Sequence, residues 1–138
     1  MANGTIAFDT LSTSGQITGT AKSLDTDYVV NGSAKSWNRF DGSAITTVAD
    51  SFNNGSATDN GTEDYTFTFT NNMSNNNYAP DAGGGRGTAA AGVGARVQSP
   101  DQITTSNYVV NMFYVDSSGN CQYVDDGIGL SIVHGDLA

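Results

Sequence analysis

The sequence predicts an all-β protein, a single-domain antiparallel β-sandwich of jelly-roll-like form. Gly, Ser, Thr and Asn make up 61 of the 138 residues, and these residue types favour turns and strands over helices. Short apolar segments alternate with turn signals at regular spacing, which is typical of sandwiches. No window combines a 3.6-residue apolar period with helix caps. The length fits one domain with a modest core.

The N-terminal part is expected to supply two short strands and a polar arm. Residues 3–11 (NGTIAFDTL) predict the first strand, residues 12–26 an arm, and residues 27–31 (DYVVN) the second strand. We therefore divide the chain into residues 1–26, a strand and arm for attachment or inter-subunit contact, and residues 27–138, the sandwich. The first residues lack the basic start and apolar core of a signal peptide.

The central segments predict a strand at residues 34–40, a turn at Asp41-Gly42, and then a hairpin. Residues 65–70 (YTFTFT) alternate strictly, so one face carries aromatic rings and the other carries Thr66, Thr68 and Thr70. Asn60-Gly61 indicates a type I′ turn, because both central residues of that turn need positive φ. The partner strand is therefore expected at residues 44–52.

The C-terminal half predicts one glycine-rich loop and three further strands. Residues 81–95 (DAGGGRGTAAAGVGA) favour an exposed loop, above all at residues 81–88. Residues 107–115 (NYVVNMFYV) are apolar on both faces, which indicates burial on two sides. Residues 116–120 form a hairpin loop that returns through residues 121–124, and a last strand begins at Ile128.

The alternation in these strands predicts a thin core of bulky side chains. Its expected members are Trp37, Phe40, Phe52, Tyr65, Phe67, Phe69, Val110, Met112, Tyr114, Ile128, Leu130 and Ile132.

Charge and cysteine content exclude several classes of function. A net charge of −9 argues against binding to nucleic acid or to anionic lipid. No apolar run is long enough to span a membrane. Cys121 is alone, so neither an intrachain disulfide nor a cysteine metal cluster can form. No cofactor or metal is expected.

Some residues leave two interpretations open. His134 is the single histidine: it is structural or solvent-exposed, or a metal ligand shared between copies, and no signature sequence supports a catalytic triad around it. The Asp116 and Asp125-Asp126-Gly127 segments resemble calcium loops superficially, but turns explain them without an ion. Trp37 is a core anchor, or a surface on which a sugar stacks.

Two loops are candidates for contact with a neighbour or a receptor. The run at 83–87 (GGGRG) lacks the lysine and hydroxyl of a phosphate loop, so a flexible surface loop is the alternative. The candidate contact residues are Gly83, Gly84, Gly85 and Arg86 in one loop, and Asp116, Ser117, Ser118 and Asn120 in the other.

Several motifs, in order, resemble a recurrent domain of tailed bacteriophages. They are NGSAKSWNRFDGS, DSF, TDNGTEDYTFTFTNNMSNNNYA and the ending SIVHGDLA. Together they are similar to the tail-fibre-like β-domain found on the virion surface of marine and cyanobacterial phages. The resemblance implies a homotrimer. We expect the face of Thr66, Thr68 and Thr70 to meet solvent or a neighbouring copy around its three-fold axis.

The resemblance implies a structural virion protein, made in the bacterial cytoplasm and exposed on the virion surface. The expected role is a tail-fibre or tail-tip component that contacts the host cell, and the alternative is a capsid decoration protein. A polysaccharide depolymerase with paired carboxylates is a minor alternative, and no enzymatic activity is expected. Expected partners are the chain itself, other virion proteins, and a host polysaccharide or receptor, without nucleic acid or membrane insertion.

Overall fold

The computed structural model describes residues 32–43, 47–85, 93–97, 100–125 and 127–138. These residues form nine strands and one short 3-10 helix, η1, at Pro100–Gln102. The strands are β1 (Ser36–Asp41), β2 (Thr47–Phe52), β3 (Asn54–Gly61), β4 (Asp64–Phe69), β5 (Ala79–Gly84), β6 (Val93–Val97), β7 (Asn107–Val115), β8 (Cys121–Tyr123) and β9 (Ile128–His134). The all-β prediction is confirmed for this part of the chain. Within it, no helix is long and apolar enough to cross a membrane.

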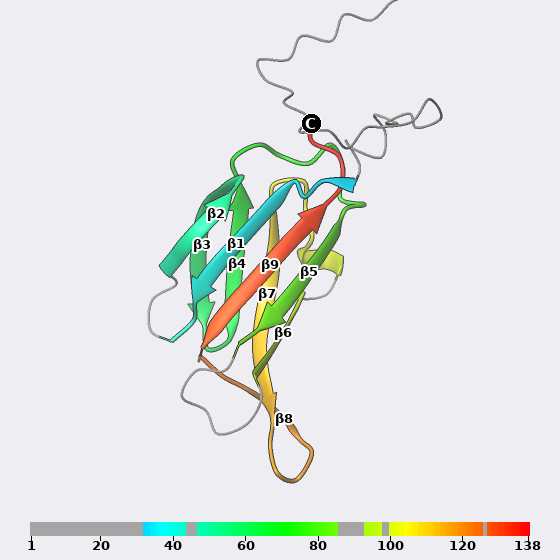
Figure 1. Ribbon diagram of the computed structural model, residues 1–138. Helices are drawn as coiled ribbons and strands as arrows, with labels where there is room; N and C mark the ends of the chain where they lie inside the picture. The colour runs from blue at the N-terminus through cyan, green and yellow to red at the C-terminus, as the bar shows by residue number, and fades with distance from the viewer. Residues whose placement is uncertain (1–31, 44–46, 86–92, 98–99, 126) are drawn as a thin grey trace, which may run out of the picture.

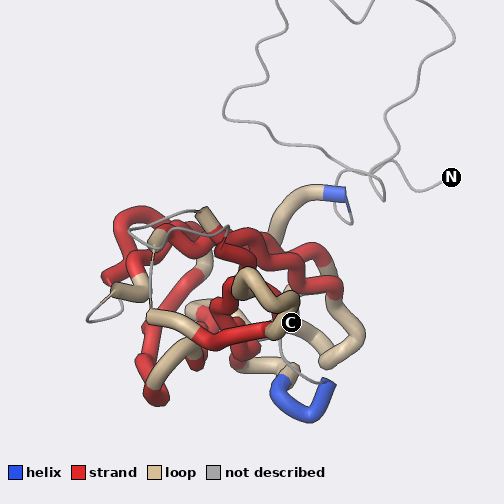
Figure 2. The backbone as a smooth tube through the Cα atoms, turned by 90° about the horizontal axis from the view of Figure 1, so that it is seen from below, coloured by secondary structure: helices blue, strands red, loops and turns tan. Residues whose placement is uncertain are grey.

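The strands build two antiparallel sheets that face each other, as expected for a sandwich. One sheet has the order β2-β1-β9-β5 and turns its outer face toward the viewer in Figure 1. The other has the order β3-β4-β7-β6, and β8 pairs with the end of β7. Figure 2 shows the same two layers from below.

The core is built on the aromatic face of β4. Tyr65, Phe67 and Phe69 are buried, as their alternation with threonine predicts. The ring of Phe67 lies 4.8 Å from that of Phe40 on β1 and 5.7 Å from that of Tyr108 on β7. Such tilted aromatic pairs add to the free energy of apolar burial. The buried cluster also contains Met73, Tyr78, Val110, Met112 and Val133.

Strand β7 is the central strand of its sheet and is buried on both faces from Tyr108 to Met112. This confirms the prediction of burial on two sides, which was drawn from the apolar residues on both faces of the segment. Burial on both faces explains why this strand reads as a nearly continuous apolar run rather than as an alternating one.

A closed ring of hydrogen bonds joins the two sheets inside the core. Asn38 Nδ2 donates to the hydroxyl of Tyr108 at 3.1 Å, and Ser131 Oγ donates to Asn38 Oδ1 at 2.9 Å. The hydroxyls of Tyr108 and Ser131 lie 2.6 Å apart, so Tyr108 completes the ring by donating to Ser131. These polar groups are therefore buried without loss of hydrogen bonding.

One end of the sandwich is closed around Tyr65. Its hydroxyl lies 2.9 Å from the carbonyl oxygen of Gly42 and 3.0 Å from Asp125 Oδ1. A Cβ atom on residue 42 would stand 2.6 Å from that hydroxyl, so the close approach requires glycine. Asp125 also accepts the backbone N–H of Glu63, which has a φ of 67°. The pKa of Glu63 is raised, first by burial of its carboxyl group and then by the nearby carboxyl groups of Asp125 and Asp64.

Alkaline titration should separate the buried tyrosines from the exposed ones. Burial raises the pKa of Tyr65, Tyr78 and Tyr108, and the hydrogen bond with Asp125 raises that of Tyr65 further. Unfolded phenols ionise near pH 10. Above that pH the unfolded chain binds fewer protons than the folded chain, so the free energy of unfolding should fall as pH rises.

The measurement is absorbance of phenolate against pH, beside circular dichroism. We expect these three tyrosines to ionise only as the chain unfolds. Ordinary titration of all six tyrosines in a chain that is still folded would contradict the assignment.

The hairpin before β4 differs from the predicted one. The partner of β4 is β3 (54–61), whereas residues 47–52 form β2 in the opposite sheet, paired with β1. The turn lies at residues 62–63 rather than at Asn60-Gly61. Asn60 instead donates to Thr66 Oγ1 at 2.8 Å, so its side chain braces the hairpin. Asn53, with a φ of 53°, turns the chain from one sheet to the other.

The glycine-rich segment is also more ordered than predicted. Gly83 and Gly84 belong to β5 and pair with Leu130 and Gly129, so they do not form a loop. A Cβ on Gly84 would lie 2.6 Å from the backbone of Gly94, because β5 and β6 approach closely where the two sheets meet. Arg86 and the expected elements at 3–11, 12–26 and 27–31 lie outside the described residues.

The predicted core is right for six of its members and wrong for several others. Phe40, Tyr65, Phe67, Phe69, Val110 and Met112 are buried. Tyr114 and Ile128 are half-buried. Trp37, Phe52, Leu130 and Ile132 point away from the core, and their position defines the surface described next.

Candidate functional site

The outer face of the four-stranded sheet carries a row of large apolar side chains. Phe52 on β2 is paired with Trp37 on β1, and Trp37 is paired with Ile132 on β9. Leu130 lies two residues before Ile132 and therefore on the same face. Their exposed fractions are 51% for Phe52, 37% for Trp37, 38% for Ile132 and 48% for Leu130. We call these four residues the apolar strip.

The strip is exposed because the inner face of β9 has room only for small side chains. A Cβ on Gly129 would stand 2.0 Å from Cζ of Phe40, and Ser131 is held in the hydrogen-bonded ring with Tyr108. The ring of Phe40 on the neighbouring strand β1 and the ring of Tyr108 on the facing sheet thus leave room for glycine and serine only. Ile128, Leu130 and Ile132 take the other side of the pleat, which corrects the prediction that they face the core.

Charged side chains stand at both margins of the strip. Arg39 on β1 is paired with Leu130 on one side and with Asp50 on the other. Asp81 on β5 is paired with Ile132. Within the described part of the chain, no ion pair involves Arg39. The face therefore has an apolar middle, with Arg39 and Asp50 on one flank and Asp81 on the other.

The predicted subunit face on β4 is different in character. Ser56 and Thr68 are hydrogen-bonded through their hydroxyl oxygens, 2.7 Å apart, and Thr66 accepts the bond from Asn60. Thr66 and Thr68 are half-buried, and Thr70 lies exposed just beyond the end of β4. The hydroxyl groups of Thr66 and Thr68 are thus already satisfied within one chain, and their role at an interface stays a prediction.

The predicted contact loop at residues 116–120 is exposed and well braced. It joins β7 to β8 and extends beyond the body of the sandwich in Figure 1. The Asp116 carboxylate accepts the N–H groups of Ser118 and Asn120, each at 2.9 Å. Bonds from the backbone of Asn120 and the side chain of Gln122 hold the pKa of Asp116 below its usual value. Ser117 is exposed and open to a partner.

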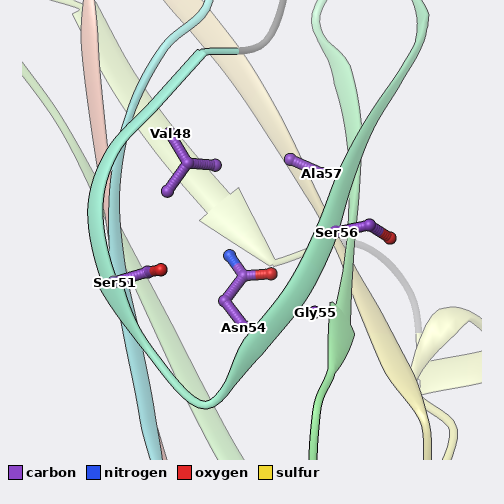
Figure 3. A pocket seen from close by; sticks show the side chains of 6 residues that line it. All are labelled: Val48, Ser51, Asn54, Gly55, Ser56 and Ala57. Atoms are coloured by element: carbon purple, nitrogen blue, oxygen red, sulfur yellow. The ribbon is translucent and has the colours of Figure 1, made fainter.

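A small cavity lies at the corner where the chain passes from β2 to β3 (Figure 3). Its volume is about 270 Å³, and it is lined by Val48, Ser51, Asn54, Gly55, Ser56 and Ala57. The amide of Asn54 is buried there, and neither its oxygen nor its nitrogen has a hydrogen-bond partner among the described residues. A buried amide of this kind is completed by water or by a small polar group.

The residues considered for metal or redox chemistry lie apart. His134 is half-buried at the end of β9, opposite Ala79. Cys121 is a free, exposed thiol at the start of β8. Across the described ranges, no group of three or more His, Cys, Asp or Glu side chains is arranged to hold a metal ion.

Sequence reasoning did not anticipate that Arg39, Asp50 and Asp81 would flank an apolar surface. The strand SWNRFD alternates, but each of its faces carries one large ring, so period two alone does not tell which face is buried. The sequence held no signal that decides it, because Asn38 is buried through hydrogen bonds with Tyr108 and Ser131 on other strands.

Comparisons with protein families, with curated proteins and with solved structures found no match to this chain.

Proposed function

We propose that this chain is a structural protein of a tailed-phage virion, in the form of a tail-fibre or tail-tip component that contacts the host cell surface. The apolar strip carries this proposal. An acidic chain that leaves Trp37, Phe52, Leu130 and Ile132 together at its surface is built to be covered by another protein. The jelly-roll-like form and the association of three copies, implied by the resemblance to phage domains, belong to the same proposal.

Host contact is assigned to the hairpin loop at residues 116–120. The loop stands on a rigid sandwich, and its backbone is fixed by the Asp116 carboxylate. Loops that a rigid scaffold positions are common sites of recognition. The exposed Ser117, and Asn120, whose backbone N–H bonds to Asp116, offer polar groups to a saccharide or a protein receptor.

A capsid decoration protein is the second candidate, and the same strip favours it. A flat apolar sheet face also suits a chain that lies on the outside of a capsid lattice. The two roles differ in the place and number of copies on the virion, because decoration proteins cover the whole head.

Electron microscopy of virions labelled with gold-coupled antibodies against this chain tests both roles. We expect label at the tail fibres or tail tip, and the purified chain should adsorb to host cells. Replacement of Ser117 and Asn120 by alanine should reduce adsorption without loss of fold, and Ser74→Ala, at an exposed residue far along the chain, serves as the control. Label over the head would support decoration instead. Virions without label would overturn the proposal.

A further inference from the structure

The apolar strip needs an occupant, and its surroundings indicate which one. Three of its members, Phe52, Trp37 and Ile132, stand side by side on three neighbouring strands. Side chains that are paired across strands lie about 5 Å apart at Cβ. The strip is therefore a continuous surface rather than a set of scattered apolar residues, and monomeric proteins seldom leave such a surface uncovered.

The charges at its margins are complementary to each other. Arg39 lies on β1 and Asp81 lies on β5, with β9 between them. Two strand spacings separate these side chains by roughly 10 Å, which is too far for an ion pair within one chain. Arg39 makes no ion pair with any residue of the described part. Asp50 is the carboxylate opposite Arg39 on β2 of the same chain, whereas the strand partner of Asp81 is Ile132. Arg39 and Asp81 are therefore two opposite charges on one face that cannot pair with each other within one chain.

A second copy of the same face closes both pairs at once. If the apolar strips of two copies are placed together, Arg39 of each copy can meet Asp81 of the other, since Leu130 and Ile132 of β9 lie between the two charges. The charge pairs then form the polar rim around an apolar centre, which is the usual arrangement of a protein interface.

We propose that the apolar strip is the surface through which copies of this chain associate, with Arg39 of one copy paired to Asp81 of the next. The inference rests on the proposed function, because both treat the chain as part of an assembly. It names the β2-β1-β9-β5 sheet as a face-to-face contact between two copies, which is separate from the association of three copies and from the threonine face of β4. A saccharide stacked on the neighbouring rings of Trp37 and Phe52 is the competing occupant, but it would leave the aliphatic Leu130 and Ile132 uncovered.

Trp37 provides a direct probe, because it is the single tryptophan of the chain. Its fluorescence should be blue-shifted and protected from acrylamide when the protein is concentrated. On dilution it should shift to the red as the copies separate. Sedimentation equilibrium, measured over the same concentrations, should show a mass of more than one chain that falls with dilution.

Substitutions in the strip should weaken association, and matched substitutions elsewhere should not. Ile132→Glu and Trp37→Ala are each expected to lower the association constant by more than about tenfold, as for a residue at an interface centre. Val115→Glu and Tyr123→Ala are the controls, since these residues are 50% and 48% exposed and lie in the other sheet. Circular dichroism confirms that every variant is folded.

Charge reversal tests the pairing itself. Arg39→Asp alone and Asp81→Arg alone should each weaken association, and the chain that carries both changes should regain it, because each copy again presents opposite charges to the next. A double variant no better than the single ones overturns the pairing of these two residues.

Three results overturn the proposal that copies associate through this face. They are a wild-type chain that is monomeric at all concentrations, association that survives Ile132→Glu, and a monomer whose Trp37 emission responds to host polysaccharide instead. A chain that self-associates as described but is absent from virions would contradict only the proposed function. A monomer found on virions would contradict only the interface.

Discussion

Replacement of Phe67 by alanine should lower the free energy of unfolding by about 3–5 kcal/mol, the usual range for a fully buried phenylalanine. The Phe67 side chain is completely buried. It contacts the ring of Phe40 on β1 of the opposite sheet and the ring of Tyr108 on β7 of its own sheet. Its removal leaves a cavity between the two sheets that these rings cannot fill. Chemical denaturation of dilute protein, followed by circular dichroism, measures the effect.

The matched control is Phe52→Ala. The sequence assigned Phe52 to the same core, but its side chain is 51% exposed on the apolar strip. We expect a loss of about 1 kcal/mol or less in the dilute monomer, as for surface positions. Equal losses for the two variants would mean that Phe52 is buried in the monomer rather than exposed on the apolar strip.

Replacement of Gly129 by alanine should also destabilise the protein strongly, by about 2–3 kcal/mol. The new Cβ would stand 2.0 Å from Cζ of Phe40 and 2.3 Å from Cε1, far inside van der Waals contact. Gly129 is buried in the middle of the sandwich, so either the Phe40 ring or the strand must move. The measurement is again denaturant unfolding, and the loss should be visible as a lower midpoint.

The control for this variant lies on the neighbouring strand. Gly83 is also a strand glycine, but nothing lies within 4 Å of a Cβ at that position. Gly83→Ala should be neutral, or more stable by a few tenths of a kcal/mol, because alanine restricts the unfolded chain. Combining Gly129→Ala with Phe40→Leu should recover part of the loss, since the smaller side chain makes room. Additive losses in the double variant would show that Phe40 is not the obstacle.

The apolar strip consists of residues that the sequence pattern assigned to the core. Alternation correctly predicted that Ile128, Leu130 and Ile132 share one face of a strand, and it assigned that face to the core because the side chains are large. Gly129 and Ser131 hold the inner face instead, because Phe40 and Tyr108 already fill the volume there. Size alone therefore indicates burial only when the neighbouring strands and the facing sheet leave room.

Some features of this protein follow from the sequence alone. The strict alternation of Tyr65, Phe67 and Phe69 with threonine determined both the strand and its buried face, because one face is wholly aromatic and the other wholly hydroxylic. The two apolar faces of residues 107–115 likewise predicted a strand that is buried on two sides. Local physics suffices in these segments, since a period of two and a clear difference between faces leave one arrangement.

Tertiary structure decided which strands pair and which faces meet. Asn60-Gly61 has the residues of a hairpin turn, yet the chain turns at residues 62–63, because Asp125, in the segment between β8 and β9, holds the backbone of Glu63. The outward direction of Trp37 follows from Asn38, whose amide is fixed by Tyr108 and Ser131 on other strands. These choices depend on volume and hydrogen bonds supplied by residues distant in the chain, and no local pattern records them.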